Sequence, residues 1–311
     1  MKALDFLIIG AQKCATTALF EHLRRHPKIQ MPLEKEVPFF AGTAEPGRSW
    51  EDFASRQYGQ DDGRLWGKAT PQYMCDPQAP DRIHALMPHT KLIAVLRDPV
   101  DRTWSHYQMG LRRDTERRRF ETAVADLLDP VALASARRQS PPEHLDGYDP
   151  ESDFYVAWSE YGRILRRYVE LFGREQILVL YAEDLKRNPG ETLDKILRFI
   201  GLPSGFRPAT LGQIVHRGGG SNRIPHGVRK WLRDRGFIRW LWERLPDSRR
   251  GRLRFIYEQW NTKPADPGQP FSSAARARLR EHYAADLQQL MQLSLPEPPW
   301  ADRYVGARAS R

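Results

Sequence analysis

The chain has 311 residues, of which 40% are hydrophobic and 11% aromatic, and its formal net charge is +10. That length can bury a substantial core and fits one large α/β domain or two small ones. Two cysteines, Cys14 and Cys75, exclude a disulfide framework and a C-x-x-C zinc site, and no apolar run reaches the length of a signal peptide or membrane span. We therefore expect a soluble, cytoplasmic protein whose positive charge attracts polyanions without choosing among them.

Buried strands and helices alternate along the chain. Short continuous apolar runs, typical of fully buried parallel strands, occupy residues 6–9, 91–96 and 177–181. Helical patterns occupy residues 17–25, 120–128, 161–172, 192–200 and 274–293. This alternation predicts one three-layer α/β/α domain over residues 1–311, with a central parallel sheet and a C-terminal helical elaboration. Residues 203–270 read as irregular, and we expect them to form a lid or acceptor region.

The loop after the first strand is a candidate phosphate site. It runs from Gly10 to Thr17, between a predicted strand and a helix N-terminus, where backbone N–H groups bind anions. Compared with the ATP-binding P-loop, Ala15 replaces the second glycine, Thr16 replaces the late lysine, and a lysine comes early, at Lys13. Such a loop suits a nucleotide with one 5′-phosphate and a short group beyond it. The alternative is a strand-to-helix turn with an incidental lysine.

The second buried strand is followed by another candidate phosphate ligand, Arg97. A guanidinium clamps a phosphate through two charge-assisted hydrogen bonds, and the Ser105 hydroxyl on the next helix adds a third. Asp98 is expected to cap that helix, with Pro99 at its first position. In one alternative Arg97 pairs with Asp98 or Asp101. In another Asp98 is a Walker B acid on magnesium, although an arginine directly before the acid argues against it.

These two elements resemble a known family. Lys13-Cys14-Ala15-Thr16-Thr17 is similar to the K-x-G-T-T loop of sulfotransferases that use 3′-phosphoadenosine 5′-phosphosulfate (PAPS), in particular the heparan-sulfate-type, carbohydrate-modifying branch and its bacterial relatives, with Ala15 in place of glycine. The order of Arg97 and Ser105 resembles the 3′-phosphate element of that family. The resemblance implies a P-loop-like fold in which Thr16 and Thr17 hold the 5′-phosphate. It also implies that Lys13 stabilises the leaving oxygen and that no metal is required.

The resemblance extends to a candidate general base and a second lysine. Glu34-Lys35-Glu36-Val37-Pro38-Phe39-Phe40 matches the K-E-x-x-F-F element of the carbohydrate branch, which makes Glu36 the base. The two phenylalanines are expected to form an apolar wall that raises the pKa of the carboxylate. The alternative is a solvated charge run. Lys68, followed by Ala69-Thr70-Pro71-Gln72-Tyr73, resembles K-T-P-x-Y, whose lysine lies near the transferred group; otherwise it is a surface lysine at a strand end.

Other candidates are less tied to motifs. A histidine base, His26 or His106, competes with Glu36, although a satisfied surface histidine is the simpler interpretation of each. The loop 216–223 occupies the place of the family's nucleotide-covering loop, with Arg217 and Gly218 as candidate ligands of the nucleotide. The alternative is an ordinary mobile loop. Residues 231–245 form a patch rich in tryptophan and arginine that suits a lid, a peripheral membrane contact or a helix on the core.

The sequence thus predicts sulfuryl transfer from PAPS to a hydroxyl, in preference to an amine, with release of 3′,5′-ADP. The acceptor is a carbohydrate, a lipid-linked glycan or a secondary metabolite, and no nucleic-acid partner is expected. Two alternatives remain: a P-loop kinase using ATP–Mg²⁺, and a non-catalytic polyanion-binding protein. The first lacks the late lysine, and the second does not explain two phosphate elements in the right order.

Overall fold

The structure is a computed structural model and describes residues 2–33, 35–41, 49–113, 115–141, 151–212 and 271–305. Its strands are β1 (Phe6–Gly10), β2 (Ile29–Gln30), β3 (Leu65–Ala69), β4 (Lys91–Leu96) and β5 (Ile177–Tyr181). Its α-helices are α1 (Thr16–Leu23), α2 (Trp50–Tyr58), α3 (Ala79–Leu86), α4 (Pro99–Arg113), α5 (Phe120–Leu127), α6 (Pro130–Arg138), α7 (Tyr161–Phe172), α8 (Ala182–Arg187), α9 (Pro189–Phe199), α13 (Ser273–Gln292) and α14 (Asp302–Val305). Short 3-10 helices are η1 (Pro71–Met74), η2 (Glu151–Asp153), η3 (Ala157–Ser159) and η4 (Arg174–Gln176).

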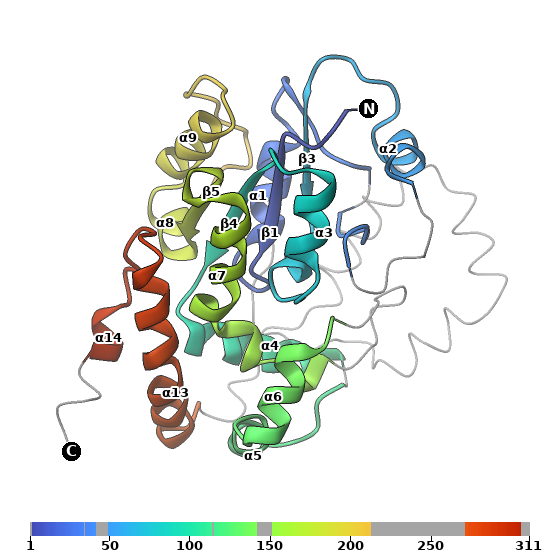
Figure 1. Ribbon diagram of the computed structural model, residues 1–311. Helices are drawn as coiled ribbons and strands as arrows, with labels where there is room; N and C mark the ends of the chain where they lie inside the picture. Colours follow the sequence, from blue (N-terminus) through green and yellow to red (C-terminus); the bar gives the residue numbers. More distant parts are fainter. Residues whose placement is uncertain are drawn as a thin grey trace, which may run out of the picture.

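The strands form one parallel sheet in the order β2-β3-β1-β4-β5. β1 is central and all its residues are buried, as its continuous apolar run predicts. The chain runs from β1 through α1 to the edge strand β2, and returns through β3 and α3 to β4 and then through α7 to β5. Connections between parallel strands are right-handed as a rule, which places α1 on one face of the sheet and α3 and α7 on the other. Figure 1 shows these layers, with α4, α5 and α6 beyond the carboxyl ends of the strands. The predicted three-layer parallel architecture is confirmed.

The strand β3 does not follow the apolar pattern. Its sequence includes Gly67 and Lys68, which interrupt an apolar run. Packing explains both, because a Cβ on Gly67 would lie 2.1 Å from the ring of Phe6 on the neighbouring strand, and Lys68 is buried among aromatic rings. The strand is therefore specified by its contacts with β1 rather than by its own hydrophobicity.

The C-terminal helix α13 packs on α7, as its apolar periodicity predicts. Four of its side chains, Leu279, Tyr283, Leu287 and Leu290, are buried. The Asp286 carboxylate accepts hydrogen bonds from the backbone N–H groups of Gly162 (2.9 Å) and Arg163 (2.8 Å) in the first turn of α7. Among the described residues, no helix is long and apolar enough to cross a membrane.

Glu160, directly before α7, joins three helices through one buried carboxylate. It accepts hydrogen bonds from Arg137 of α6 (2.6 and 2.9 Å), Arg163 of α7 (2.6 Å) and His282 of α13 (3.0 Å). Burial opposes ionisation, but the bonds from His282 and Arg137 and the charge of Arg163 outweigh it and lower the pKa of Glu160 from 4.5 to about 2. The folded state therefore favours the ionised carboxylate.

We expect Glu160→Gln to lower the free energy of unfolding at pH 7 by about 2 kcal/mol, because it removes the charge from a buried carboxylate that accepts hydrogen bonds from Arg137 and Arg163, whose own side chains are 39% and 33% exposed. The folded pKa is depressed, so the stabilisation is complete above about pH 4.5 and is lost as the pH falls towards 2. Urea unfolding at several pH values checks both parts. Glu175→Gln, at an ion pair whose carboxylate is 88% exposed, should change stability by less than about 0.5 kcal/mol.

Candidate active site

The loops that follow β3, β1 and β4 meet at one edge of the sheet. The Thr70 N–H donates to the Ile8 carbonyl over 3.1 Å, and the Ala11 N–H donates to the Val95 carbonyl over 2.8 Å. The turn after β1 therefore lies between the ends of β3 and β4, at the carboxyl edge where open α/β sheets bind ligands. The two candidate phosphate elements, after β1 and after β4, therefore lie at the same edge.

The turn between β1 and α1 has the backbone of an anion site. A Cβ on Gly10 would lie 2.6 Å from the Met74 Cβ, so only glycine lets the turn begin so close to η1. Lys13 (φ 73°) and Ala15 (φ 65°) are left-handed, and alternation of left-handed and ordinary backbone forms anion-binding nests. The helix α1 begins at Thr16 with no side-chain cap and no acidic residue in its first turn. Its first N–H groups therefore lack intrahelical partners and suit an anion.

Ala15 replaces the glycine of the family loop at a position where glycine is favoured. A left-handed backbone costs an alanine conformational energy that glycine does not incur. Ala15 is exposed, so its methyl group is not forced into a packed interior. The substitution therefore adds backbone strain and leaves the turn intact.

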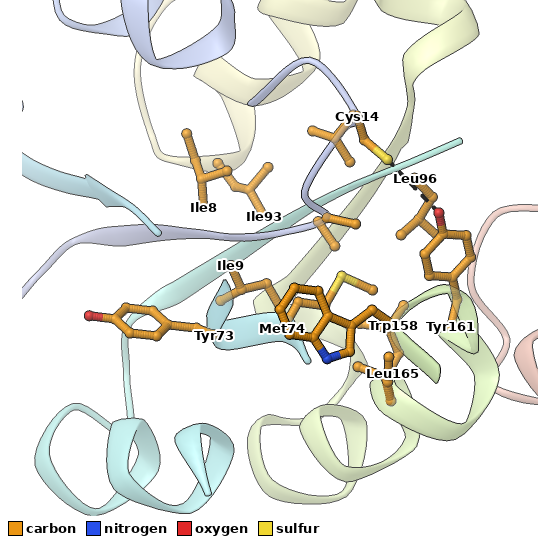
Figure 2. Packing of buried hydrophobic residues seen from close by; sticks show 14 of the residues in the cluster. Ile8, Ile9, Cys14, Tyr73, Met74, Ile93, Leu96, Trp158, Tyr161 and Leu165 are labelled. Atoms are coloured by element: carbon orange, nitrogen blue, oxygen red, sulfur yellow. Dashed lines mark hydrogen bonds between the residues drawn. The ribbon is translucent and has the colours of Figure 1, made fainter. Parts of the chain in front are cut away.

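Cys14 anchors the turn in the core. Its side chain is fully buried, and its sulfur lies 3.8 Å from both the Gln12 carbonyl oxygen and the Tyr161 hydroxyl. Figure 2 shows the sulfur directed at the Tyr161 hydroxyl. Burial raises the pKa of the thiol to about 11. Of Cys14, only the backbone is left to take part in binding an anion.

Lys13 extends towards the end of α4. Its Nζ lies 3.7 Å from the Met109 Sδ. Burial, followed by the charges of Arg112, Arg113 and Arg102, lowers the pKa of Lys13 to about 7, and Glu151 opposes that shift. An anion bound at the turn would add negative charge and favour the protonated lysine.

Arg97 follows β4 and is half-buried at the same edge. Within the described part of the chain, its guanidinium makes no hydrogen bond or ion pair, so the expected alternative of pairing with Asp98 or Asp101 is wrong. Asp101 instead approaches Arg276 at 4.0 Å. Ser105, also buried, lies on α4 in the same strand–helix unit. Toward the part of the chain that the structure describes, the donors of Arg97 are therefore unused.

Asp98 caps α4 as predicted. Its Oδ1 accepts hydrogen bonds from the N–H of Val100 (3.0 Å) and from the Tyr304 hydroxyl (2.7 Å), and its Oδ2 accepts one from Arg303 (3.0 Å). The carboxylate thus joins α4 to the C-terminal helix α14. These partners occupy the oxygens that a Walker B acid would offer to magnesium.

Glu36 and Lys68 belong to one structural unit at the end of β3. The Glu36 N–H donates to the Ala69 carbonyl over 3.2 Å, and the Lys68 ammonium donates to the Val37 carbonyl over 2.5 Å. Glu36 itself has a left-handed backbone (φ 69°), and its carboxylate, 40% exposed, pairs with Lys35. Phe39, which was expected to form an apolar wall beside the Glu36 carboxylate, packs into an aromatic cluster with Phe40, Trp50 and Phe53.

Two expectations change with this arrangement. The Glu36 carboxylate is partly open rather than seated in an apolar environment. Lys68 is fully buried rather than a surface lysine. Its ammonium supports the segment that carries Glu36, while its predicted role near the transferred group stays a prediction.

Neither of the two candidate histidines, His26 and His106, is placed to compete with Glu36 as the base. His106 is fully buried, not at the surface, and burial together with Arg102 lowers its pKa to about 3. His26 lies beyond the opposite end of α1, where its Nδ1 accepts a hydrogen bond from the Lys28 N–H over 3.1 Å. Its ring packs against Phe206.

Three site residues have no motif that reveals them. Arg102 and Glu151 contact the turn through Gln12, although they lie far away in the sequence. Glu183 follows β5 near Arg97; burial raises its pKa, and its Oε2 is buried without a hydrogen-bond partner among the described residues. The predicted ligands Arg217 and Gly218, and the patch 231–245, lie outside the described residues.

A parallel sheet whose first strand leads through a short turn into a helix N-terminus defines a P-loop-like α/β fold. Comparison with known families agrees and is more specific. Residues 4–217 match the sulfotransferase domain family, and the chain belongs to that family.

Individual relatives agree with this assignment. Human (Homo sapiens) heparan sulfate glucosamine 3-O-sulfotransferase 6 is 31% identical over 201 residues, which cover 63% of this chain and 52% of that protein. Mouse (Mus musculus) bifunctional heparan sulfate N-deacetylase/N-sulfotransferase 4 is 29% identical over 204 residues, covering 63% and 22%. A solved sulfotransferase from Alicyclobacillus acidocaldarius superposes with a TM-score of 0.64 at 21% identity, over 95% of this chain and 98% of that one. The chain spans about half the length, or less, of these curated relatives, and the solved structure supports the fold.

Proposed function

We propose that this protein transfers a sulfuryl group from PAPS to a hydroxyl of a carbohydrate acceptor and releases 3′,5′-ADP. The observation that carries the proposal is that the turn around Lys13 and the end of β4, where Arg97 lies, meet at one edge of the sheet. Among the described residues, the Arg97 guanidinium has no hydrogen-bond or ion-pair partner. A donor with phosphates at both ends of its ribose fits these two anion sites. ATP would place its charges along one chain of phosphates instead.

In the proposed reaction the acceptor oxygen attacks sulfur in line with the departing phosphate oxygen. The new S–O bond forms as the S–O bond to the 5′-phosphate breaks, and the acceptor proton passes to the Glu36 carboxylate. Lys13 and the first N–H groups of α1 face the charge that develops on the leaving oxygen. Thr16 and Thr17 hold the 5′-phosphate, and Arg97 with Ser105 holds the 3′-phosphate. No step in this scheme uses a metal.

A carbohydrate is proposed as acceptor because the curated relatives carry names of enzymes that modify heparan sulfate. The half-exposed Glu36 supports an acceptor that approaches from solvent. A hydroxyl is favoured over an amine, and lipid-linked glycans and secondary metabolites belong to the same proposal. A cytoplasmic location is also proposed, supported by the two free thiols of Cys14 and Cys75.

Calorimetric titration with 3′,5′-ADP, 5′-AMP and ATP–Mg²⁺ tests the donor. We expect 3′,5′-ADP to bind tightest. Arg97→Met should weaken it by about 10–100-fold, the effect of losing a charge-assisted phosphate clamp, while 5′-AMP binding stays unchanged. Arg166→Met, at a surface arginine hydrogen-bonded to Gln289, is the matched control and should bind like wild type.

Two results would overturn the proposal. Preference for ATP–Mg²⁺ would make the protein a kinase. Absence of nucleotide binding would make it a polyanion-binding protein whose charge, rather than a nucleotide site, determines its partners.

A further inference from the structure

A buried polar cluster lies behind the turn that carries Lys13. It consists of Gln12, Arg102, His106 and Glu151, and we call it the Glu151 cluster. Its members come from the turn, from α4 and from η2, so it joins three segments that are distant in the sequence. Arg102, His106 and Glu151 are each at most 4% exposed. The proposed transfer chemistry uses none of these side chains directly.

Every N–H donor of the Arg102 guanidinium has an acceptor inside the protein. Its Nε donates to the Gln12 carbonyl (3.1 Å), its Nη1 to the Tyr155 carbonyl (3.1 Å) and the Ser159 hydroxyl (3.2 Å), and its Nη2 to the Gln12 Oε1 (3.5 Å) and the His106 Nδ1 (3.0 Å). A guanidinium has five N–H donors, and here each has an acceptor. Arg102 therefore fixes both the backbone and the side chain of Gln12.

These contacts also determine which ring nitrogen of His106 carries the proton. Its Nδ1 faces a pure donor, Arg102, and must accept; its Nε2 then carries the proton and donates to Glu151 over 3.0 Å. The pKa of His106, lowered to about 3 by burial and Arg102, keeps the ring neutral above mildly acidic pH. Glu151 is thus the negative member of the cluster.

Glu151 holds the Gln12 amide from the other side. The Gln12 Nε2 donates to both carboxylate oxygens, over 2.9 and 3.1 Å, and Arg113 approaches the same carboxylate at 3.9 Å. Gln12 directly precedes Lys13, so a bond that fixes Gln12 also limits where the Lys13 backbone can move. Glu151 is the acidic contact through which η2 reaches the turn.

The charges around Lys13 give Glu151 a second effect. From α4, Arg102, Arg112 and Arg113 lower the pKa of Lys13, in addition to burial, and the neutral His106 lies beside them. From η2, Glu151 raises it. Without Glu151, protonated Lys13 would face the three arginines with less compensating charge.

We propose that Glu151 is a positioning residue of the transfer site, which fixes the donor turn through Gln12 and offsets the arginine charge around Lys13. The inference rests on the proposed role of Lys13. Its test therefore begins with a property of the ligand-free protein that does not depend on transfer.

The first measurement is the pH dependence of Lys13 acetylation in the ligand-free full chain, followed by peptide mass spectrometry. We expect Glu151→Gln to move the midpoint to lower pH by about 1 unit, as for loss of a nearby opposite charge. Glu116→Gln is the matched control. It is also a buried carboxylate, but it bonds Tyr155 and Arg118, and its variant should keep the wild-type midpoint. An unchanged midpoint in folded Glu151→Gln would overturn the charge role.

A second variant separates positioning from charge and remains informative if Glu151→Gln does not fold. Gln12→Met removes the amide and leaves Glu151 bound to His106. We expect its Lys13 midpoint to stay near wild type while 3′,5′-ADP binds about tenfold more weakly, the effect of one lost charge-assisted hydrogen bond. Unchanged affinity would overturn the positioning role.

The pH profile of transfer distinguishes this inference from the proposed function. In Glu151→Gln the alkaline limb of kcat/KM should move to lower pH together with the acetylation midpoint. If the midpoint moves but the wild-type protein transfers no sulfuryl group from PAPS, the charge role stands and the proposed function fails. If transfer occurs and neither property moves, the inference fails and the proposed function stands.

Discussion

Glu36→Gln is expected to lower kcat for sulfuryl transfer by about 10²–10⁴-fold and to leave 3′,5′-ADP affinity near wild type. Glutamine has the same shape and leaves the backbone bond from residue 36 to the Ala69 carbonyl in place, but it cannot take the acceptor proton. The partly exposed carboxylate can meet an acceptor from solvent without a large rearrangement. Initial rates with PAPS and a panel of saccharides, alongside calorimetry, check both halves of the prediction.

Glu51→Gln provides the control, because Glu51 is an exposed acid in the first turn of α2. It should transfer at the wild-type rate. Full activity in folded Glu36→Gln would contradict the assignment of the base. The buried, neutral His106 could not replace it, so the base would then have to be another group.

Much of the fold could be predicted because its strands are locally distinctive. The runs 91–96 and 177–181 coincide with β4 and β5, and Asp98 and Pro99 fix the start of α4. The strand β3 was not evident, since Gly67 is needed for the ring of Phe6 and Lys68 is stabilised by a carbonyl and aromatic rings. These contacts form only in the folded protein and leave no pattern in the sequence of the strand.

The candidate site divides in the same way. Residues of the turn and Arg97 sit directly after strands, so a short motif and the strand pattern place them at one edge. Arg102, His106 and Glu151 act through contacts between α4, η2 and the turn, and no local spacing encodes those contacts. Sequence patterns therefore predict the side chains that would contact the ligand. The charged residues that support those side chains can be identified only from the packed structure.

Lys13→Met is expected to lower kcat by about 10²–10³-fold while 3′,5′-ADP binding falls by less than about tenfold. Methionine is an unbranched side chain of similar length, but it carries no charge and cannot donate to the Met109 sulfur as the Lys13 Nζ does. The turn and the uncapped N-terminus of α1 still bind the 5′-phosphate of the product, whereas the charge that develops on the leaving oxygen loses its cation. Rapid-quench kinetics with PAPS, with calorimetry on the same samples, separate these quantities.

Lys186→Met, at an exposed lysine of α8, should behave like wild type in both measurements. The distribution of the loss between rate and binding then decides the role of Lys13. A loss confined to kcat places the lysine on the transition state, because an interaction made only there does not contribute to product affinity. A loss confined to 3′,5′-ADP affinity, with normal turnover at saturating PAPS, would reduce Lys13 to a binding residue and leave the leaving oxygen to the N–H groups of the turn.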